Sequence, residues 1–459
     1  MIIPMNQYIR SLTLTLSIFI PLTFINVSES SELSEAKITL NDLYLFDEIS
    51  SIDVSHSAKQ IAYSVSSVDE KKDRYRNDIW LLDVNKNKKK VLIKGRPWVG
   101  KTKFSPDDTL LGYLAPGRGQ YSEYQQIWTI NTNYRTKRQL TKLKANINDF
   151  EWSPDGTQMI LVADSISVDK KTKSSVQTQK PIVIDRYYFK EDGKEFLGDE
   201  RQHLHLLDIK SRTTKQLTKG TSNEILPSWS PDSKKIAYVT KTGEMDRTNN
   251  YDVYVLEIDS TNNPIQLTTN LGADSSSSRP QWSPDGKKIA YLHGGDPALL
   301  WYALQELAVI DLDTKINSIL TKELDRNVSS PQWSDDGQSI YFVIEDNMKS
   351  QLAKYSLTNQ KIKKITPSNY YISGWAKNYV VRNGKIGLIL SNTNSPDEVY
   401  FYDENSLSQQ SHHNSELLSS RKILKTETIS FKAADGEELF GMMIKPDNFD
   451  PSKQYPLII

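Results

Sequence analysis

The sequence predicts an all-β protein built as a seven-bladed β-propeller, and two observations support this prediction. A motif of the Trp-Ser-Pro-Asp-Gly type recurs seven times, mostly at intervals of about 40 to 50 residues, which is the repeat length of propeller blades. Each copy precedes a second strand pair and a short closing strand, so each repeat contributes four strands. The seven copies begin at Val54, Phe104, Trp152, Trp229, Trp282, Trp333 and, in degenerate form, Trp375.

The motif itself predicts a tight turn between two antiparallel strands. In the copy at Trp282, Pro284 fixes φ, Asp285 can bond nearby backbone amides, and Gly286 accepts a positive φ. The residues that follow, 288–292, are mostly apolar, as in a half-buried strand. We therefore interpret the motif carboxylates as turn formers and the motif tryptophans as packing residues between blades, rather than as ligands.

Residues 1–30 are predicted to be a secretory signal peptide. Arg10 precedes an apolar run over residues 12–27, and the small residues Ser28 and Ser30 follow it, which is the order of such a signal. Pro21 and several hydroxyl residues make the run a poor permanent membrane helix. We expect an exported, periplasmic protein with no membrane span once the signal is removed.

Two segments flank or interrupt the predicted propeller, which covers residues 45–420. Residues 31–44 form a lead-in in which Thr39 and Asp42 stand at capping-box spacing, so a short helix is expected. The long interval between the third and fourth motifs leaves about 25 extra residues, which include a predicted hairpin. Its side chains could reach the central cavity and contact a peptide carbonyl or carboxylate, or the hairpin could be a solvated loop. The candidate substrate-gating residues are Arg186, Tyr187, Tyr188 and Arg201.

The pattern changes over residues 421–459, where no further motif occurs. A strand at 428–431 is followed by an Asp435-Gly436 turn and a strand at 439–446. A loop through 448–453 then leads to an apolar run that reaches Ile459. This segment is predicted to be the beginning of a second domain.

Composition excludes several kinds of chemistry. Lys and Arg number 57, as do Asp and Glu, so net charge gives no support for nucleic-acid binding. With no cysteine there is no disulfide, thiolate metal site or cysteine nucleophile. No phosphate-binding or dinucleotide-binding glycine loop is present, so no cofactor is expected. The six histidines form no convincing metal site, and His293-Gly-Gly leaves a blade strand rather than forming an oxyanion loop.

The repeat resembles the propellers of two exported families, the translocation protein of the Tol-Pal envelope system and the prolyl oligopeptidase family of serine peptidases. The stretch 186–203 and the run Asp435-Gly436, Lys445-Pro446, Phe449-Asp-Pro451 and Tyr455-Pro-Leu457 resemble the acylaminoacyl-peptidase and dipeptidyl-peptidase-like branch of the peptidases. That resemblance implies that residues 421–459 begin an α/β-hydrolase domain. It also implies serine-based hydrolysis of short peptides, with the propeller acting as a size filter.

The catalytic part of such a domain is not expected in this chain. No Gly-x-Ser-x-Gly elbow occurs, and none of the histidines follows one. We expect the hydrolase domain to be incomplete at Ile459, no catalytic residue to be present, and the chain to be inactive alone, so its standing as an enzyme is open. The alternative is a non-catalytic envelope propeller that binds proteins, and homo-oligomerisation is open in either case.

Overall fold

The computed structural model describes residues 36–165, 183–184, 186–192, 195–244, 246–260, 263–373, 379–403 and 406–459. The predicted signal peptide and the motif at Trp375 lie outside these residues. Among the helices of the described part, none is both long and apolar enough to cross a membrane.

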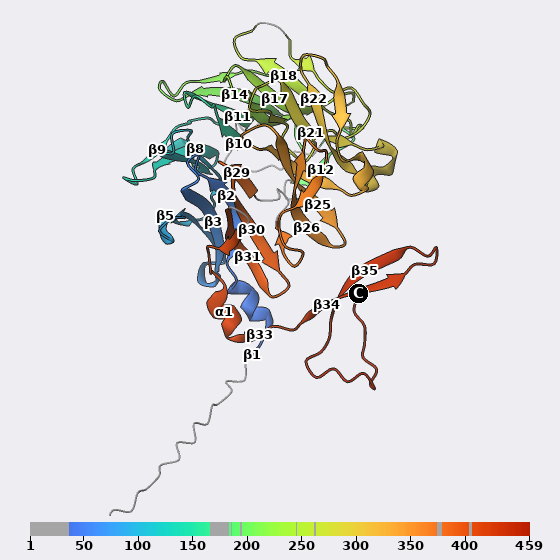
Figure 1. Cartoon of the computed structure of the whole chain (residues 1–459). Helices are drawn as coiled ribbons and strands as arrows, with labels where there is room; N and C mark the ends of the chain where they lie inside the picture. The colour runs from blue at the N-terminus through green and yellow to red at the C-terminus, as the bar shows by residue number, and fades with distance from the viewer. Residues whose placement is uncertain are drawn as a thin grey trace, which may run out of the picture.

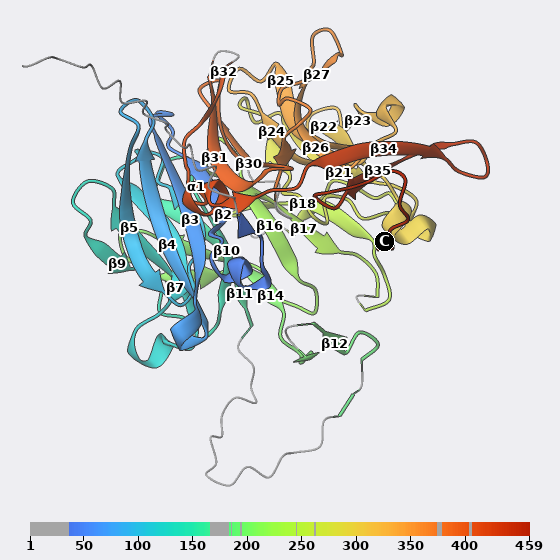
Figure 2. The same ribbon diagram turned by 90° about the horizontal axis from the view of Figure 1, so that it is seen from below.

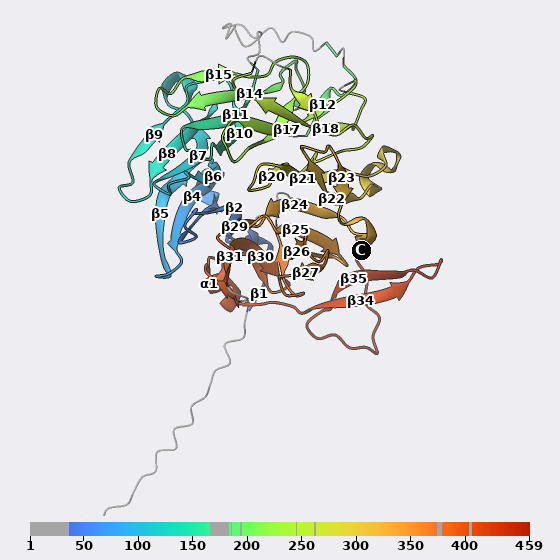
Figure 3. The same cartoon turned by 45° about the horizontal axis from the view of Figure 1, so that its top comes forward.

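Seven antiparallel sheets of four or five strands are arranged around a central axis, which is the predicted seven-bladed propeller (Figure 3). The strands of each blade follow one another along the chain. Blade 1 consists of β2 (Glu48–Val54), β3 (Gln60–Asp69), β4 (Arg74–Asp83) and β5 (Lys88–Arg96); blade 2 of β6 (Gly100–Phe104), β7 (Leu110–Pro116), β8 (Gln125–Asn131) and β9 (Lys137–Gln139); and blade 3 of β10 (Ile147–Trp152), β11 (Gln158–Asp164), β14 (Gln202–Asp208) and β15 (Thr214–Gln216).

The remaining four blades repeat this order, and short 3-10 turns occur in some connections. Blade 4 consists of β16 (Glu224–Trp229), β17 (Lys235–Lys241), β18 (Tyr251–Glu257) and β19 (Ile265–Gln266); blade 5 of β20 (Gln281–Trp282), β21 (Lys288–Gly294), β22 (Gln305–Asp311) and β23 (Asn317–Ile319); blade 6 of β24 (Val328–Trp333), β25 (Ser339–Asp346), β26 (Lys349–Ser356) and β27 (Ile362–Lys364); and blade 7 of β28 (Tyr371–Ile372), β29 (Tyr379–Arg382), β30 (Lys385–Asn392), β31 (Ser395–Asp403) and β32 (Ser406–Gln409). The 3-10 turns are η2 (Glu70–Lys72), η3 (Gly119–Tyr121), η5 (Pro297–Tyr302) and η6 (Lys322–Leu324).

The Ser-Pro-Asp-Gly sequences form the turns between the first and second strands of their blades. In blade 5 the Ser283 hydroxyl donates to the Asp285 carboxylate at 2.5 Å, and Gly286 has a φ of +70°. A Cβ on Gly286 would lie 3.6 Å from Cδ of Pro231, which belongs to the turn of blade 4. Successive turns therefore pack against one another around the ring, which explains why the proline and the glycine recur together.

The motif tryptophans lie between blades. The Nε1 atom of Trp152 donates to the carbonyl of Lys103 in blade 2 at 3.2 Å, and that of Trp229 donates to the carbonyl of Glu151 in blade 3 at 3.2 Å. Trp333 makes the same bond to Gln281 in blade 5 at 2.9 Å. Each indole thus combines apolar packing with one hydrogen bond to the preceding blade, as a buried tryptophan usually does.

Blade 7 closes the ring by packing against blade 1. Its inner hairpin turns at Asn383 and Gly384, where β29 pairs with β30, so this turn lies beyond the predicted motif at Trp375. No strand of blade 1 pairs with blade 7 in the described part of the chain; instead Val54 and Phe401 belong to one buried apolar cluster. Gly387 permits this approach, because a Cβ there would lie 2.5 Å from Cγ2 of Val54.

The two flanking segments meet outside blade 1. The predicted short helix is a 3-10 helix, η1 (Leu40–Tyr44), and the backbone N–H of Thr39 donates to the Asp42 carboxylate at 2.7 Å, as the capping-box spacing indicated. Arg421 forms two hydrogen bonds to Asp42, at 2.9 and 2.7 Å. Beside this pair, β1 (Ala36–Lys37) runs parallel to β33 (Arg421–Lys422), which follows α1 (Ser415–Ser419).

The C-terminal segment forms a separate hairpin of β34 (Thr426–Lys432) and β35 (Glu438–Ile444), which projects away from the blades (Figure 1). It turns at Asp435 and Gly436, as predicted, and Gly436 has a φ of +93°. Several of its apolar side chains are exposed, including Phe431 and Ile444.

Candidate functional site: the central tunnel

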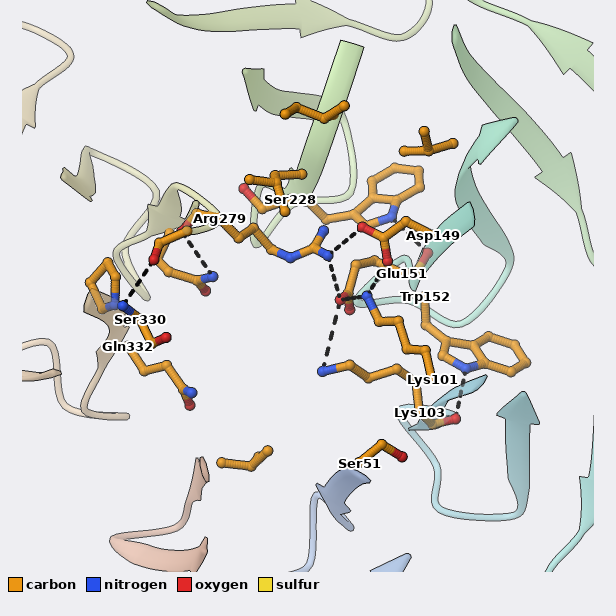
Figure 4. A pocket seen from close by; sticks show the side chains of 18 of the residues that line it. Ser51, Lys101, Lys103, Asp149, Glu151, Trp152, Ser228, Arg279, Ser330 and Gln332 are labelled. Carbon is orange, nitrogen blue, oxygen red and sulfur yellow. Dashed lines mark hydrogen bonds and ion pairs between the residues drawn. The ribbon is translucent and has the colours of Figure 1, made fainter. Parts of the chain in front are cut away.

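A cavity of about 920 Å³ lies on the propeller axis and is lined by the inner strands of all seven blades. Many of the lining residues stand one or three positions before a motif, and Figure 4 labels most of them. Those one position before are Lys103, Glu151, Ser228, Gln281 and Gln332. Those three positions before are Ser51, Lys101, Asp149, Leu226, Arg279 and Ser330.

One wall of the cavity is a network of half-buried ions. Lys101 of blade 2 contacts two carboxylates of blade 3, that of Asp149 at 2.5 Å and that of Glu151 at 2.7 Å. Arg279, just before β20 in blade 5, reaches past blade 4 and donates to Asp149 at 2.6 Å. It also donates to the carbonyl of Pro227 in blade 4. A single guanidinium therefore links three consecutive blades (Figure 4).

The charges of this network determine the protonation of its carboxylates. Burial alone would raise the pKa of Glu151, but the nearby charges of Lys101, Lys103 and Arg279 outweigh it and hold that pKa far below its usual range. The pKa of Asp149 is lowered in the same way, because Arg279 and Lys101 outweigh the effect of burial. Both groups are therefore carboxylates at neutral pH, while burial and the charge of Arg279 lower the pKa of Lys101 from its ordinary value.

Neutral polar side chains of blades 6 and 7 form another part of the wall. The Gln332 amide of blade 6 donates to the carbonyl of Tyr379 in blade 7 at 2.8 Å and accepts from the backbone N–H of Val381 at 3.1 Å. The Tyr379 hydroxyl donates to the carbonyl of Ser330 at 2.5 Å. The cavity thus combines charged side chains with neutral hydrogen-bonding groups, which suits a polar, extended ligand.

The four residues proposed as gating groups do not line this cavity. Arg186 forms two hydrogen bonds to Asp246, at 3.0 and 2.6 Å, and Arg201 donates to the carbonyl of Thr221 at 2.7 Å. Tyr187 and Tyr188 are exposed on the same insertion. The insertion hairpin, β12 (Lys190–Glu191) and β13 (Glu195–Phe196), lies at the edge of the propeller (Figure 2). Any gating role of these residues stays a prediction.

Sequence reasoning missed the ionic network. Its members lie one and three positions before the motifs, at Lys101 and Lys103 in blade 2 and at Asp149 and Glu151 in blade 3. Charged residues alternating in a strand that should be buried were the available signal. Within the described residues no group of three or more histidine, aspartate or glutamate side chains is placed to hold a metal ion.

No protein-family profile matches the chain, but individual proteins do. Dipeptidyl-peptidase 5 of Porphyromonas endodontalis is 24% identical over 482 residues, which cover 99% of this chain and 67% of that protein. The uncharacterised peptidase YuxL of Bacillus subtilis is 25% identical over 224 residues, 48% of this chain and 34% of that protein. Among solved structures, the acylaminoacyl peptidase of Pyrococcus horikoshii superposes with a TM-score of 0.69 at 16% identity, covering 88% of this chain and 59% of that one. The matched regions thus span between about a third and two thirds of these peptidases.

Proposed function

We propose, on the premise that the chain belongs to the prolyl oligopeptidase family of peptidases, that it is the propeller part of an exported serine peptidase that hydrolyses short peptides. Peptidase relatives and the propeller fold they share support a role in a peptidase. The serine chemistry, the export and the gating role are the parts that we infer. The protein-binding alternative has no comparable support, because the curated relatives reported above are named as peptidases.

The observation that carries the proposal is the cavity on the propeller axis. Its volume of about 920 Å³ lies near the top of the range of about 300–1,000 Å³ that is usual for small-ligand pockets. Such a space accommodates a few residues of extended peptide and excludes a folded domain. The inter-blade tryptophan bonds and the Arg279 bridge hold the surrounding strands together, so the cavity acts as a size filter.

The catalytic groups are supplied by residues outside this chain. Acyl transfer by a serine peptidase needs a serine nucleophile, a histidine base and a carboxylate that orients the histidine. In α/β-hydrolase domains the serine lies in a Gly-x-Ser-x-Gly elbow. Residues 1–459 contain no such elbow. We therefore expect the hairpin of β34 and β35 to be continuous with a hydrolase domain that the propeller covers.

The experiment is a peptide-length series with the complete translated reading frame, using aminoacyl and dipeptidyl nitroanilides and internally quenched peptides of about 4 to 30 residues. Cleavage should fall steeply with length, and residues 1–459 alone should cleave none of the substrates. Equal cleavage of short and long peptides would overturn the size filter. Turnover by residues 1–459 alone would overturn the placement of the catalytic groups.

A further inference from the structure

The charges that line the tunnel do not cancel. Four cationic side chains line it, those of Lys101, Lys103, Arg279 and Arg382, against the two carboxylates of Asp149 and Glu151. Lys101 and Arg279 are bound tightly to those carboxylates, as described above. Lys103 makes only longer contacts, 3.7 Å to Asp53 and 3.8 Å to Glu151. Arg382 has no carboxylate partner among the described residues.

Arg382 is held at the junction of the last and first blades. It is the final residue of β29, immediately before the Asn383-Gly384 turn. Its Nη1 donates to the carbonyl of Val381, the preceding residue, at 3.0 Å. Its Nε is buried and makes no hydrogen bond within the described chain. Because the covered Nε is out of reach of a ligand in the tunnel, the terminal amine groups of this tunnel-lining residue are the donors available to a ligand acceptor.

Carboxylates near this junction accept hydrogen bonds from backbone amides. Asp108 accepts from the backbone N–H groups of His56 at 2.6 Å and Ser57 at 2.9 Å. Asp53 accepts from the N–H of Phe104 at 2.7 Å. The positive charge of Arg382 also acts on His56, whose pKa is lowered first by burial and next by this charge, against opposing effects of Asp53 and Asp108.

We propose that Arg382 is an anion-recognition site of the central tunnel, which binds a carboxylate of a peptide held there. The terminal amines of a guanidinium carry a permanent positive charge and donate charge-assisted hydrogen bonds to a carboxylate. Lys103 of blade 2 adds positive charge to the same tunnel; blade 1 separates it from Arg382 in blade 7. Only the statement that the ligand is a peptide depends on the proposed function. It adds that peptides with an acidic side chain or a free C-terminus are preferred.

The test is equilibrium binding of short peptides to the full chain, measured by calorimetry, without any need for hydrolysis. The probes are Ala-Ala-Glu-Ala amide, Ala-Ala-Gln-Ala with a free C-terminus, and Ala-Ala-Gln-Ala amide. The two carboxylate peptides distinguish the two sources of the anion. At least one should bind about 10-fold more tightly than Ala-Ala-Gln-Ala amide, which has no carboxylate, and its affinity should fall as salt is raised.

The variant R382Q should lose this preference, and R382K should retain part of it, because lysine keeps the charge but not the paired donors. R326Q is the matched control: Arg326 is an exposed residue of blade 6 that pairs with Asp346 at 2.8 Å, and its replacement should leave the affinities unchanged. Circular dichroism verifies that each variant is folded.

Equal affinities for peptides with and without a carboxylate, an unchanged preference in folded R382Q, or no binding by the wild-type chain would overturn the proposal. Failure of the peptidase assignment would look different. In that case the carboxylate preference would be present, but the complete reading frame would cleave no peptide.

Discussion

Replacing Arg279 by methionine should destabilise the propeller, because this side chain holds blades 3, 4 and 5 together at the tunnel wall. Its guanidinium lies 2.6 Å from the Asp149 carboxylate and 3.4 Å from that of Glu151. The side chains of Arg279 and Asp149 are only 16% and 17% exposed, so this is a largely buried pair. Methionine fills much of the same volume but leaves the carboxylates short of one partner.

The expected magnitude follows from burial. Removing one partner of a buried ion pair costs about 3–5 kcal/mol. Asp149 retains Lys101 at 2.5 Å, so the low end applies and the loss of unfolding free energy in R279M should be about 3 kcal/mol. The equivalent change R326M removes an exposed pair in blade 6, in which Arg326 is 44% exposed, and should cost less than about 1 kcal/mol.

The assay is urea unfolding followed by circular dichroism, with a double-mutant cycle between R279M and D149N. The coupling energy between the two residues should be about 2 kcal/mol, because they are in direct contact. If R279M costs no more than R326M, or the two changes are additive within about 0.5 kcal/mol, the bridge does not stabilise the ring and the reasoning fails.

Three further predictions use the same unfolding assay. G387A should lose about 1–3 kcal/mol, because the new methyl group would meet Val54 between blades 7 and 1; an unchanged urea midpoint would contradict the packed closure. T218V should cost about 1–3 kcal/mol, since the Thr218 hydroxyl accepts from a buried backbone N–H at 2.9 Å, whereas T213V on the exposed turn should be neutral. The pKa of Glu151 is depressed in the folded state. The stabilisation that its ionised form contributes is therefore complete above its unfolded pKa of about 4.3 and is lost as the pH falls from there toward the depressed folded pKa. Wild-type stability should therefore fall more steeply than that of E151Q between about pH 5 and 2, and parallel curves would refute the charge assignment.

The sequence revealed the blades because their determinants are local. A proline, an aspartate and a glycine within four residues specify a turn, and the structure forms that turn at Ser283-Pro-Asp-Gly286. Blade 7 was harder to place, because its inner hairpin turns at Asn383-Gly384 without a tryptophan motif. The β34–β35 turn at Gly436 was also local and was predicted at the correct position.

The tunnel could not be predicted because its contacts are not local. Arg279 and Asp149 are 130 residues apart in sequence and meet across blade 4 once blades 3, 4 and 5 have packed together. Arg186 shows the same dependence on the fold. An arginine beside two tyrosines suggested a peptide contact, which stays a prediction; in the structure Asp246, 60 residues away, pairs with that arginine at the edge of the propeller. Sequence identifies the charged side chains, whereas the fold determines which of them are neutralised.

The peptidase assignment is tested most directly by labelling the complete translated reading frame with a fluorophosphonate probe, which reacts with activated serines, and locating the labelled peptide by mass spectrometry. The prediction is a single labelled serine outside residues 1–459, in a protein that hydrolyses short peptidyl nitroanilides. A folded protein with no labelled serine and no hydrolysis would contradict it.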